Sequence, residues 1–475
     1  MVLQQLAAEI DEEAGKIRFY RDLYDGLIGA KLNRRQQIIL GGDNNPTDGA
    51  DFVQNFVQMV VDIPAERMIV DGFTFTGDDA LNGDEGKPAL WWEQNRMDGT
   101  QLDVHISNRR DGYTYVLVSW DEDNGRPEFT HELAFDDTYD GVRVHYNPEN
   151  KKEVIAATKR WTTRDEEGNT VYRRNIYYPH LITKEINKAG VGGRNESQWQ
   201  PYIEEGDDVA KDETTGKYIG INWLDKDNQP LGVPIIAFNN RASGYSQGVS
   251  AVENARGAQY AKNKADIDLV AAADAAGFPM YTLHGDSFPK GGDEDANDSD
   301  PPTFGPGEAL SFPNENSKFG KVEPSNLTDL RETSLHWLSQ LFILSRISPS
   351  YAHIAKTVQS AEGQQGNEMS MLSMIRANAV DVGNSWEDVI RMGLKLDNVF
   401  GDGKHNLSDI TVSTIWKDFE VRNEMKRKKE MAETAQLLIA ADANPYAAYL
   451  VSGFSEDEAE RLAASGFVLD GENEA

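Results

Sequence analysis

The stretch AVENARGAQYAKNKADIDLVAAADAAGFP, residues 251–279, reads as one long helix that has few large apolar side chains. A helix over residues 251–276 would span about 39 Å. Small side chains allow a neighbour to approach closely, but each contact contributes little free energy. We therefore expect this helix to pack between copies of itself in a closed ring. Its weak apolar stripe consists of Ala255, Ala258, Ala265, Leu269, Ala272 and Ala276.

The composition excludes several classes of protein. The chain of 475 residues has no cysteine, which rules out disulfides and thiolate metal sites. It has no apolar run as long as the roughly 18 residues of a membrane span, and its acidic N-terminus lacks the order of a signal peptide, so a cytosolic location is expected. A formal net charge of −32 argues against tight binding to nucleic acid. The charge fits either a highly soluble surface or one that tolerates nearby DNA without binding it.

Helical and β patterns alternate along the N-terminal half. Residues 2–29 and 51–63 show apolar residues at helical spacing. Residues 65–240 contain short β-branched and aromatic runs, among them DVHISNRRDGYTYVLVSW, and predict a mostly antiparallel β region. Asp111-Gly112 and Asn124-Gly125 are expected to form hairpin turns. A last strand, VPIIAF at 233–238, precedes the long helix.

The C-terminal half is mainly helical. Two short β-like segments, FPMYTLHG and ALSFP, flank an acidic insert at 290–302. A helix over 325–346 follows and is expected to begin with Ser325 as its N-cap. Residues 417–475 read as further helices, one of them opened by a capping box of Ser455 and Glu458. The most regular pattern predicts a helical face held over seven turns. It consists of Leu372, Ile375, Ala379, Val382, Trp386, Val389, Gly393 and Leu396.

Few motifs suggest chemistry. GYSQG at 244–248 matches the nucleophile elbow of α/β-hydrolases, and a serine hydrolase using Ser246 with His284 or His336 is the alternative function. Against it, NNRAS separates the motif from the preceding strand, and the upstream strands read as hairpins. The acidic run at 293–300 lacks the glycine and glutamate of a calcium loop. The basic run at 426–429 is either a solvated helix face or a contact with an acidic partner.

Taken together, the order of these patterns resembles the portal proteins of tailed bacteriophages, of the siphophage type, over residues 20–460. The telling segment is LGVPIIAFNNRASGYSQGVSAVENARGAQYAKNKADIDL, which is similar to the strand, Asn-Arg loop, Gly-x-Ser turn and first stem helix of that family. LWWEQNRMDGTQLDVHISNRRDGYTYVLVSWD resembles its Trp–Asn helix followed by a strand pair, and QSAEGQQGNEMSMLSMIRANA resembles the start of its long third helix. Gly248-Val249-Ser250 departs from the Ser-Glu that often follows this turn.

The resemblance implies an α+β portal fold. It places a β-rich wing at 1–240, a first stem helix at 241–276 and a small α/β clip at 277–324. A second stem helix follows at 325–345, then a channel loop at 346–359, a long helix at 360–400 and a helical crown at 401–475.

The same resemblance implies a non-enzymatic ring, with twelve subunits expected, and no cofactor or metal. Double-stranded DNA would pass through the channel when it is packaged and ejected at one capsid vertex of the virion, after assembly in the host cytoplasm. The implied partners are the terminase large subunit, a neck adaptor, and the major capsid and scaffolding proteins, with no membrane. Ser350, His353, Lys356 and Gln359 are the candidates for contact with DNA. The candidates for the subunit interface in the stem are Ala258, Ala265, Leu269 and Ala272.

Overall fold

The computed structural model divides the chain into two compact units, residues 1–417 and residues 418–475. The described residues are 14–29, 34, 36–37, 54–77, 86–136, 138–150, 152–188, 199–204, 206–212, 214–241, 247–277, 281–284, 318–321, 326–348, 351, 361–407, 410–420, 424–441, 444–454 and 456–465.

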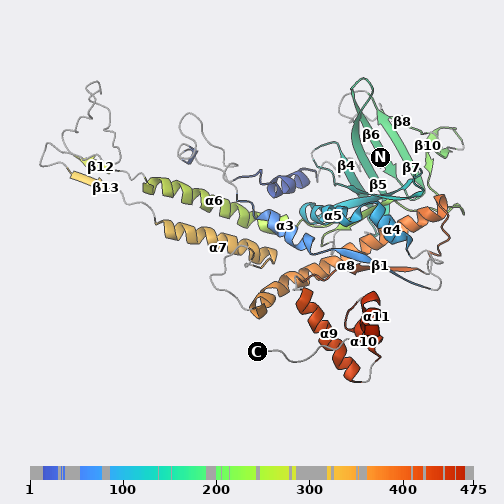
Figure 1. The fold of residues 1–475 in the computed structure, drawn as a ribbon. Coiled ribbons are helices and arrows are strands. Elements are labelled where there is room, and N and C mark those ends of the chain that lie inside the picture. Colours follow the sequence, from blue (N-terminus) through green and yellow to red (C-terminus); the bar gives the residue numbers. More distant parts are fainter. Residues whose placement is uncertain are drawn as a thin grey trace. The chain divides into compact units, whose positions relative to one another are not determined.

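An antiparallel sheet of seven strands is the largest β element of the first unit (Figure 1). Its path is β4-β5-β6-β7-β10-β9, and β8 pairs with β7. Sequence turns such as DEEGN at 165–169 join consecutive strands, as the sequence predicts. The strands are β4 (Gly141–Tyr146), β5 (Val154–Arg164), β6 (Thr170–Tyr177), β7 (Leu181–Asn187), β8 (Gln200–Pro201), β9 (Val209–Lys211) and β10 (Tyr218–Asn222).

Two smaller antiparallel sheets complete the β structure next to the long helices. One has the order β11-β2-β3, formed by β2 (Tyr113–Asp121), β3 (Arg126–Glu132) and β11 (Ile235–Asn239). The predicted turn at Asn124-Gly125 joins β2 to β3, and Gly125 has a φ of 61°. The other pairs β1 (Val70–Thr76) with β14 (Thr411–Trp416), which lies in a region where only helices were expected.

The expectation of β structure was wrong for residues 97–111, which form the helix α5 (Met97–Asp111). Asp111-Gly112 is therefore not a hairpin turn. Gly112 has a φ of 93° and ends α5 as its left-handed cap before β2 begins. The helical period was hard to see because α5 buries polar side chains as well as apolar ones, among them His105, Asn108 and Arg109.

Several short helices and one long helix belong to the same unit. Residues 14–24 are helical, followed by α3 (Val57–Glu66) and α4 (Lys87–Gln94). The long helix is α8 (Ala361–Phe400), and every residue of its predicted seven-turn face, from Leu372 to Leu396, is buried. This face packs against β2, β3, β11 and β14, so the prediction from its spacing is confirmed.

A helical hairpin and a pair of short strands form the region between β11 and α8. The helices α6 (Val252–Gly277) and α7 (Leu327–Ser345) lie side by side (Figure 1). Antiparallel β12 (Tyr281–His284) and β13 (Lys318–Lys321) lie between them in sequence, and β13 was not predicted. The N-cap of α7 is Asn326 rather than Ser325, because Asn326 Oδ1 accepts a hydrogen bond from Thr328 N at 3.0 Å. The insert at 290–302 and the segment ALSFP lie outside the described residues.

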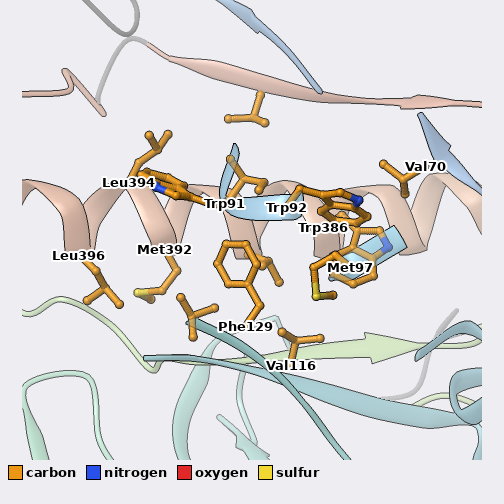
Figure 2. Close-up of a cluster of buried hydrophobic side chains, with 14 of the residues drawn as sticks. Val70, Trp91, Trp92, Met97, Val116, Phe129, Trp386, Met392, Leu394 and Leu396 are labelled. Atoms are coloured by element: carbon orange, nitrogen blue, oxygen red, sulfur yellow. The ribbon is translucent and has the colours of Figure 1, made fainter. Parts of the chain in front are cut away.

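The main hydrophobic core lies where α8 meets the two smaller sheets and α4 (Figure 2). Trp386 of α8 packs edge to face on Trp92 and Phe238, at ring-centre distances of 5.0 and 4.6 Å. Trp91, Phe129 and Met392 extend this core along α8. The core therefore connects a helix near the end of the first unit to strands more than 200 residues earlier.

The described residues of the second unit form three helices, as the sequence predicts for its last part. They are α9 (Glu424–Ala440), α10 (Pro445–Val451) and α11 (Glu456–Ser465). A small core of its own includes Ala435, Tyr449 and Ala459. Ser455, half of the predicted capping box, lies outside the described residues. No helix among the described parts of the two units is long and apolar enough to cross a membrane.

Candidate subunit interface and channel site

One face of α6 is buried by the same chain, and the rest is open. Val252, Ala255 and Ile267 are fully buried, and Ala258 is buried as well. Ala258 therefore packs inside its own chain in this structure, which removes it from the expected interface stripe. Ala265, Leu269 and Ala272 are only partly buried, and their assignment to an interface remains a prediction.

Polar side chains attach α6 to the segment that precedes α3. Gln259 is buried, and its side chain accepts from Phe56 N at 3.1 Å and donates to Gln54 O at 2.6 Å and to Asn263 Oδ1 at 2.8 Å. Lys262 Nζ donates to Gln54 Oε1 at 3.0 Å, and its charge lies 5.5 Å from the centre of the Phe56 ring. These directional hydrogen bonds hold the N-terminal half of α6 in place. In an ordinary core helix, a larger apolar face would do this instead.

The two helices of the hairpin are joined by a polar contact as well. Ser334 Oγ of α7 donates to Asp266 Oδ1 of α6 at 2.6 Å, and Asp266 also pairs with Lys262 one turn away. Leu338, Leu341 and Phe342 supply the buried apolar side of α7. This face of the hairpin is thus held by its own chain, and the expected packing of α6 between sister chains stays a prediction for its other faces.

Several large apolar residues of the hairpin are exposed. Trp337 is 37% exposed, Ile343 is 57% exposed and Leu344 is 54% exposed on α7, and Val270 is 39% exposed on α6. Exposed apolar side chains gathered along one element are typical of protein interfaces. The sequence signal was the run LHWLSQLFILS, which is apolar around the whole helix. These residues are better candidates for an interface than the alanines.

A polar cluster joins one residue of the expected channel loop to α3 and α8. Arg67, just after α3, donates to Glu368 of α8 at 3.2 Å and also to the hydroxyl of Tyr351. Burial raises the pKa of Tyr351, and the charge of Arg67 acts in the opposite direction. Tyr351 lies within the expected loop and Glu368 follows it in α8, so one guanidinium connects a loop residue to the helix after the loop. The DNA-contact candidates Ser350, His353, Lys356 and Gln359 lie outside the described residues.

The final glycine of the GYSQG motif has a packing role at the joint between β11 and α6. A Cβ on Gly248 would lie 1.9 Å from Gly112 O and 2.5 Å from Asn240 N. Ser250 Oγ donates to Arg110 O and accepts from Val252 N, which tethers the first turn of α6. The final glycine of the motif is therefore explained by close backbone approach.

The alternative of a serine hydrolase lacks the architecture it needs. A nucleophile elbow follows a strand of a parallel sheet, whereas β11 is the antiparallel neighbour of β2. Ser246 lies outside the described residues, and His336 is an exposed residue of α7. Within the described ranges, no group of His, Asp and Glu side chains is arranged to hold a metal ion.

The comparison with family models agrees with the family that the sequence resembles. A profile of the family described as "Phage portal protein, SPP1 Gp6-like" matches residues 3–442. The chain is also similar to a chain in the solved structure titled "Neck of empty GTA particle computed with C6 symmetry", at 12% identity and a TM-score of 0.39. That match covers 86% of this chain and 91% of the other. No curated protein matches.

Proposed function

The chain belongs to the phage portal protein family, and from this premise we propose that it forms a ring-shaped channel through which double-stranded DNA is packaged and ejected. Portal proteins are structural components of the virion at the head–tail connection and are not enzymes. The proposal places the ring at one capsid vertex, with twelve copies. Its partners would be the terminase large subunit, a neck adaptor, and the major capsid and scaffolding proteins.

The observation that carries this proposal is the exposed outer side of the α6–α7 hairpin. A hairpin that leaves Trp337, Ile343 and Leu344 in water is unfavourable in a monomer, since each exposed apolar side chain forgoes burial. A closed ring buries the same patch in every subunit against a different patch of its neighbour. We assign the stem of the channel to this hairpin, and Ala265, Leu269 and Ala272 to the same interface.

The net charge suits a channel that DNA must slide through. The chain carries 79 acidic and 47 basic residues. Each phosphate contact made by a basic wall would have to break at every step of translocation, whereas an acidic wall keeps the affinity for DNA low. Ser350, His353, Lys356 and Gln359 are proposed to touch the DNA backbone transiently from the channel loop. The cluster of Arg67, Tyr351 and Glu368 would tether that loop at Tyr351.

Electron microscopy of the purified protein, without other phage components, tests the proposal. Closed rings with a central hole are the expected result. A monodisperse monomer at micromolar concentration, with the folded far-UV spectrum of an α+β protein, would contradict it.

A further inference from the structure

Three arginines line a small cavity of the first unit. Arg109 comes from α5, Arg241 follows β11, and Arg346 follows α7. The other polar residues that line the cavity are Asn240, Asn254 and Ser345, and none of the described lining residues is acidic. Guanidinium groups recognise carboxylates and other oxyanions through paired N–H donors, so this lining favours an anion.

Arg109 is the buried member of the three, with 1% of its surface exposed. Its Nε donates to Val61 O and its Nη2 to Val60 O, both at 3.2 Å, and Nη1 makes no hydrogen bond with a described residue. Burial lowers the pKa of Arg109 to about 10, and the nearby charge of Arg241 adds to this effect. A buried charge with only neutral partners is unfavourable, so an anion placed here gains from the interaction.

The two outer arginines are held in an uncommon backbone conformation. Arg241 has a φ of 57° and Arg346 a φ of 59°, which is the left-handed region that non-glycine residues rarely adopt. Neither forms an ion pair with a described residue. Inside the cavity, Asn240 Oδ1 and Ser345 Oγ are buried without a hydrogen-bond partner among the described residues. Strained backbone beside unused polar atoms is typical of a binding site.

We propose that the cavity receives one carboxylate from a second copy of this chain. The inference rests on the proposed function, because the ring places sister chains side by side. At about 30 Å³ the cavity exceeds the roughly 10–15 Å³ that one water needs, which suits a carboxylate group rather than a bulky phosphate ester. With 79 acidic against 47 basic residues, the chain itself is an abundant source of carboxylates.

A zero-length cross-link tests this proposal directly. In the Arg346→Lys variant, a carbodiimide joins the introduced amine to a carboxylate only when the two are in contact. Rings assembled from equal amounts of light and heavy isotope-labelled subunits should yield peptides that connect position 346 of one isotope to an Asp or Glu of the other. The Arg391→Lys variant is the matched control. Its position pairs with Asp388 of the same chain at 3.1 Å, so its link should join peptides of one isotope only.

The possible results separate this inference from the proposed function. One outcome is that rings form but position 346 gives only same-chain links, or no links. This outcome would overturn the carboxylate proposal without contradicting the proposed ring. A protein that forms no rings at all contradicts the proposed function instead. As a second measurement, the double variant Arg241→Ala and Arg346→Ala should lower the NaCl concentration at which rings dissociate by at least twofold. Arg391→Ala should leave it unchanged, and equal values for both variants would count against the proposal.

Discussion

Trp386 joins several elements of the first unit through one buried side chain. Its ring packs on Trp92 and Phe238, and its Nε1 donates to His105 Nε2 at 3.0 Å. His105 is fully buried, and this bond requires a neutral imidazole with Nε2 free to accept. Packing and protonation state are therefore coupled at this position.

We expect Trp386→Ala to destabilise the protein by about 3–5 kcal/mol, because it removes a fully buried aromatic ring and leaves a cavity. Chemical denaturation of the variant and the wild type measures this difference in unfolding free energy. Trp337→Ala is the matched control in the unassembled protein, since that ring is 37% exposed and less burial is lost. Equal losses from the two variants would contradict the assignment of Trp386 to the core.

Acid should weaken the fold through His105. Burial lowers its pKa from 6.5 to about 3, so between these values the unfolded chain binds a proton that the folded chain does not. Above pH 6.5 His105 is neutral in both the folded and the unfolded chain and does not alter the free energy of unfolding. As the pH falls from 6.5 toward 3, the free energy of unfolding declines by about 1.4 kcal/mol per pH unit. In His105→Gln, unfolding free energies measured from pH 7 to pH 4 should decline less steeply than in the wild type. The exposed His336→Gln serves as control, and an unchanged slope in His105→Gln would refute this role.

Two glycine variants should have opposite effects. Gly248→Ala places a Cβ against Gly112 O, and overpacking of this kind costs about 1–3 kcal/mol or more. Gly257→Ala adds a methyl group within α6, where nothing lies within 4 Å, and should stabilise the protein by about 0.5–1 kcal/mol. Thermal unfolding of both variants checks the signs. A neutral Gly248→Ala would mean that the motif glycine is not constrained by packing.

At the scale of elements, regular spacing was the reliable part of the sequence. The face from Leu372 to Leu396 was predicted residue by residue, because a helix packed on sheets repeats its buried positions every three or four residues. The strands of the seven-stranded sheet were recognisable from their β-branched runs and turns. The helix α5 was missed because tertiary packing buries polar Asn108 and Arg109, and β14 because its partner β1 lies more than 300 residues away.

The candidate site was less predictable for the same physical reason. Asp266 meets Ser334, and Gln259 meets Gln54, only after the chain has folded, so no local pattern marks them. Alanine spacing suggested a stripe on α6, yet Ala258 packs within its own chain. The large apolar residues of α7 were visible in the sequence, but only the structure distinguishes the buried side from the exposed one.

Trp337→Ala should weaken assembly while sparing the fold. The residue is 37% exposed on α7, so its loss removes burial between subunits in addition to a smaller amount within one chain. Sedimentation velocity across a dilution series should show rings of the variant dissociating at about tenfold or higher protein concentration than the wild type. Leu437→Ala is the control, because that residue is 73% exposed on α9, outside the proposed stem. If the two variants assemble alike, the stem interface is misplaced.

At the scale of the whole molecule, a strongly acidic chain is proposed to form a symmetric assembly. A net charge of −32 per chain would make like-charged copies repel, so the ring needs apolar contact and specific ion pairs to close. We propose that the exposed residues of α7 supply the first and the arginine cavity the second. Both belong to the first unit, which the family match covers almost completely.

Native mass spectrometry of the purified full-length chain tests the central claim most directly. The account predicts a single closed oligomer whose mass is an integer multiple of 52.9 kDa, twelve copies being the proposed number. A folded chain that stays at 52.9 kDa under conditions that preserve noncovalent assemblies would contradict it.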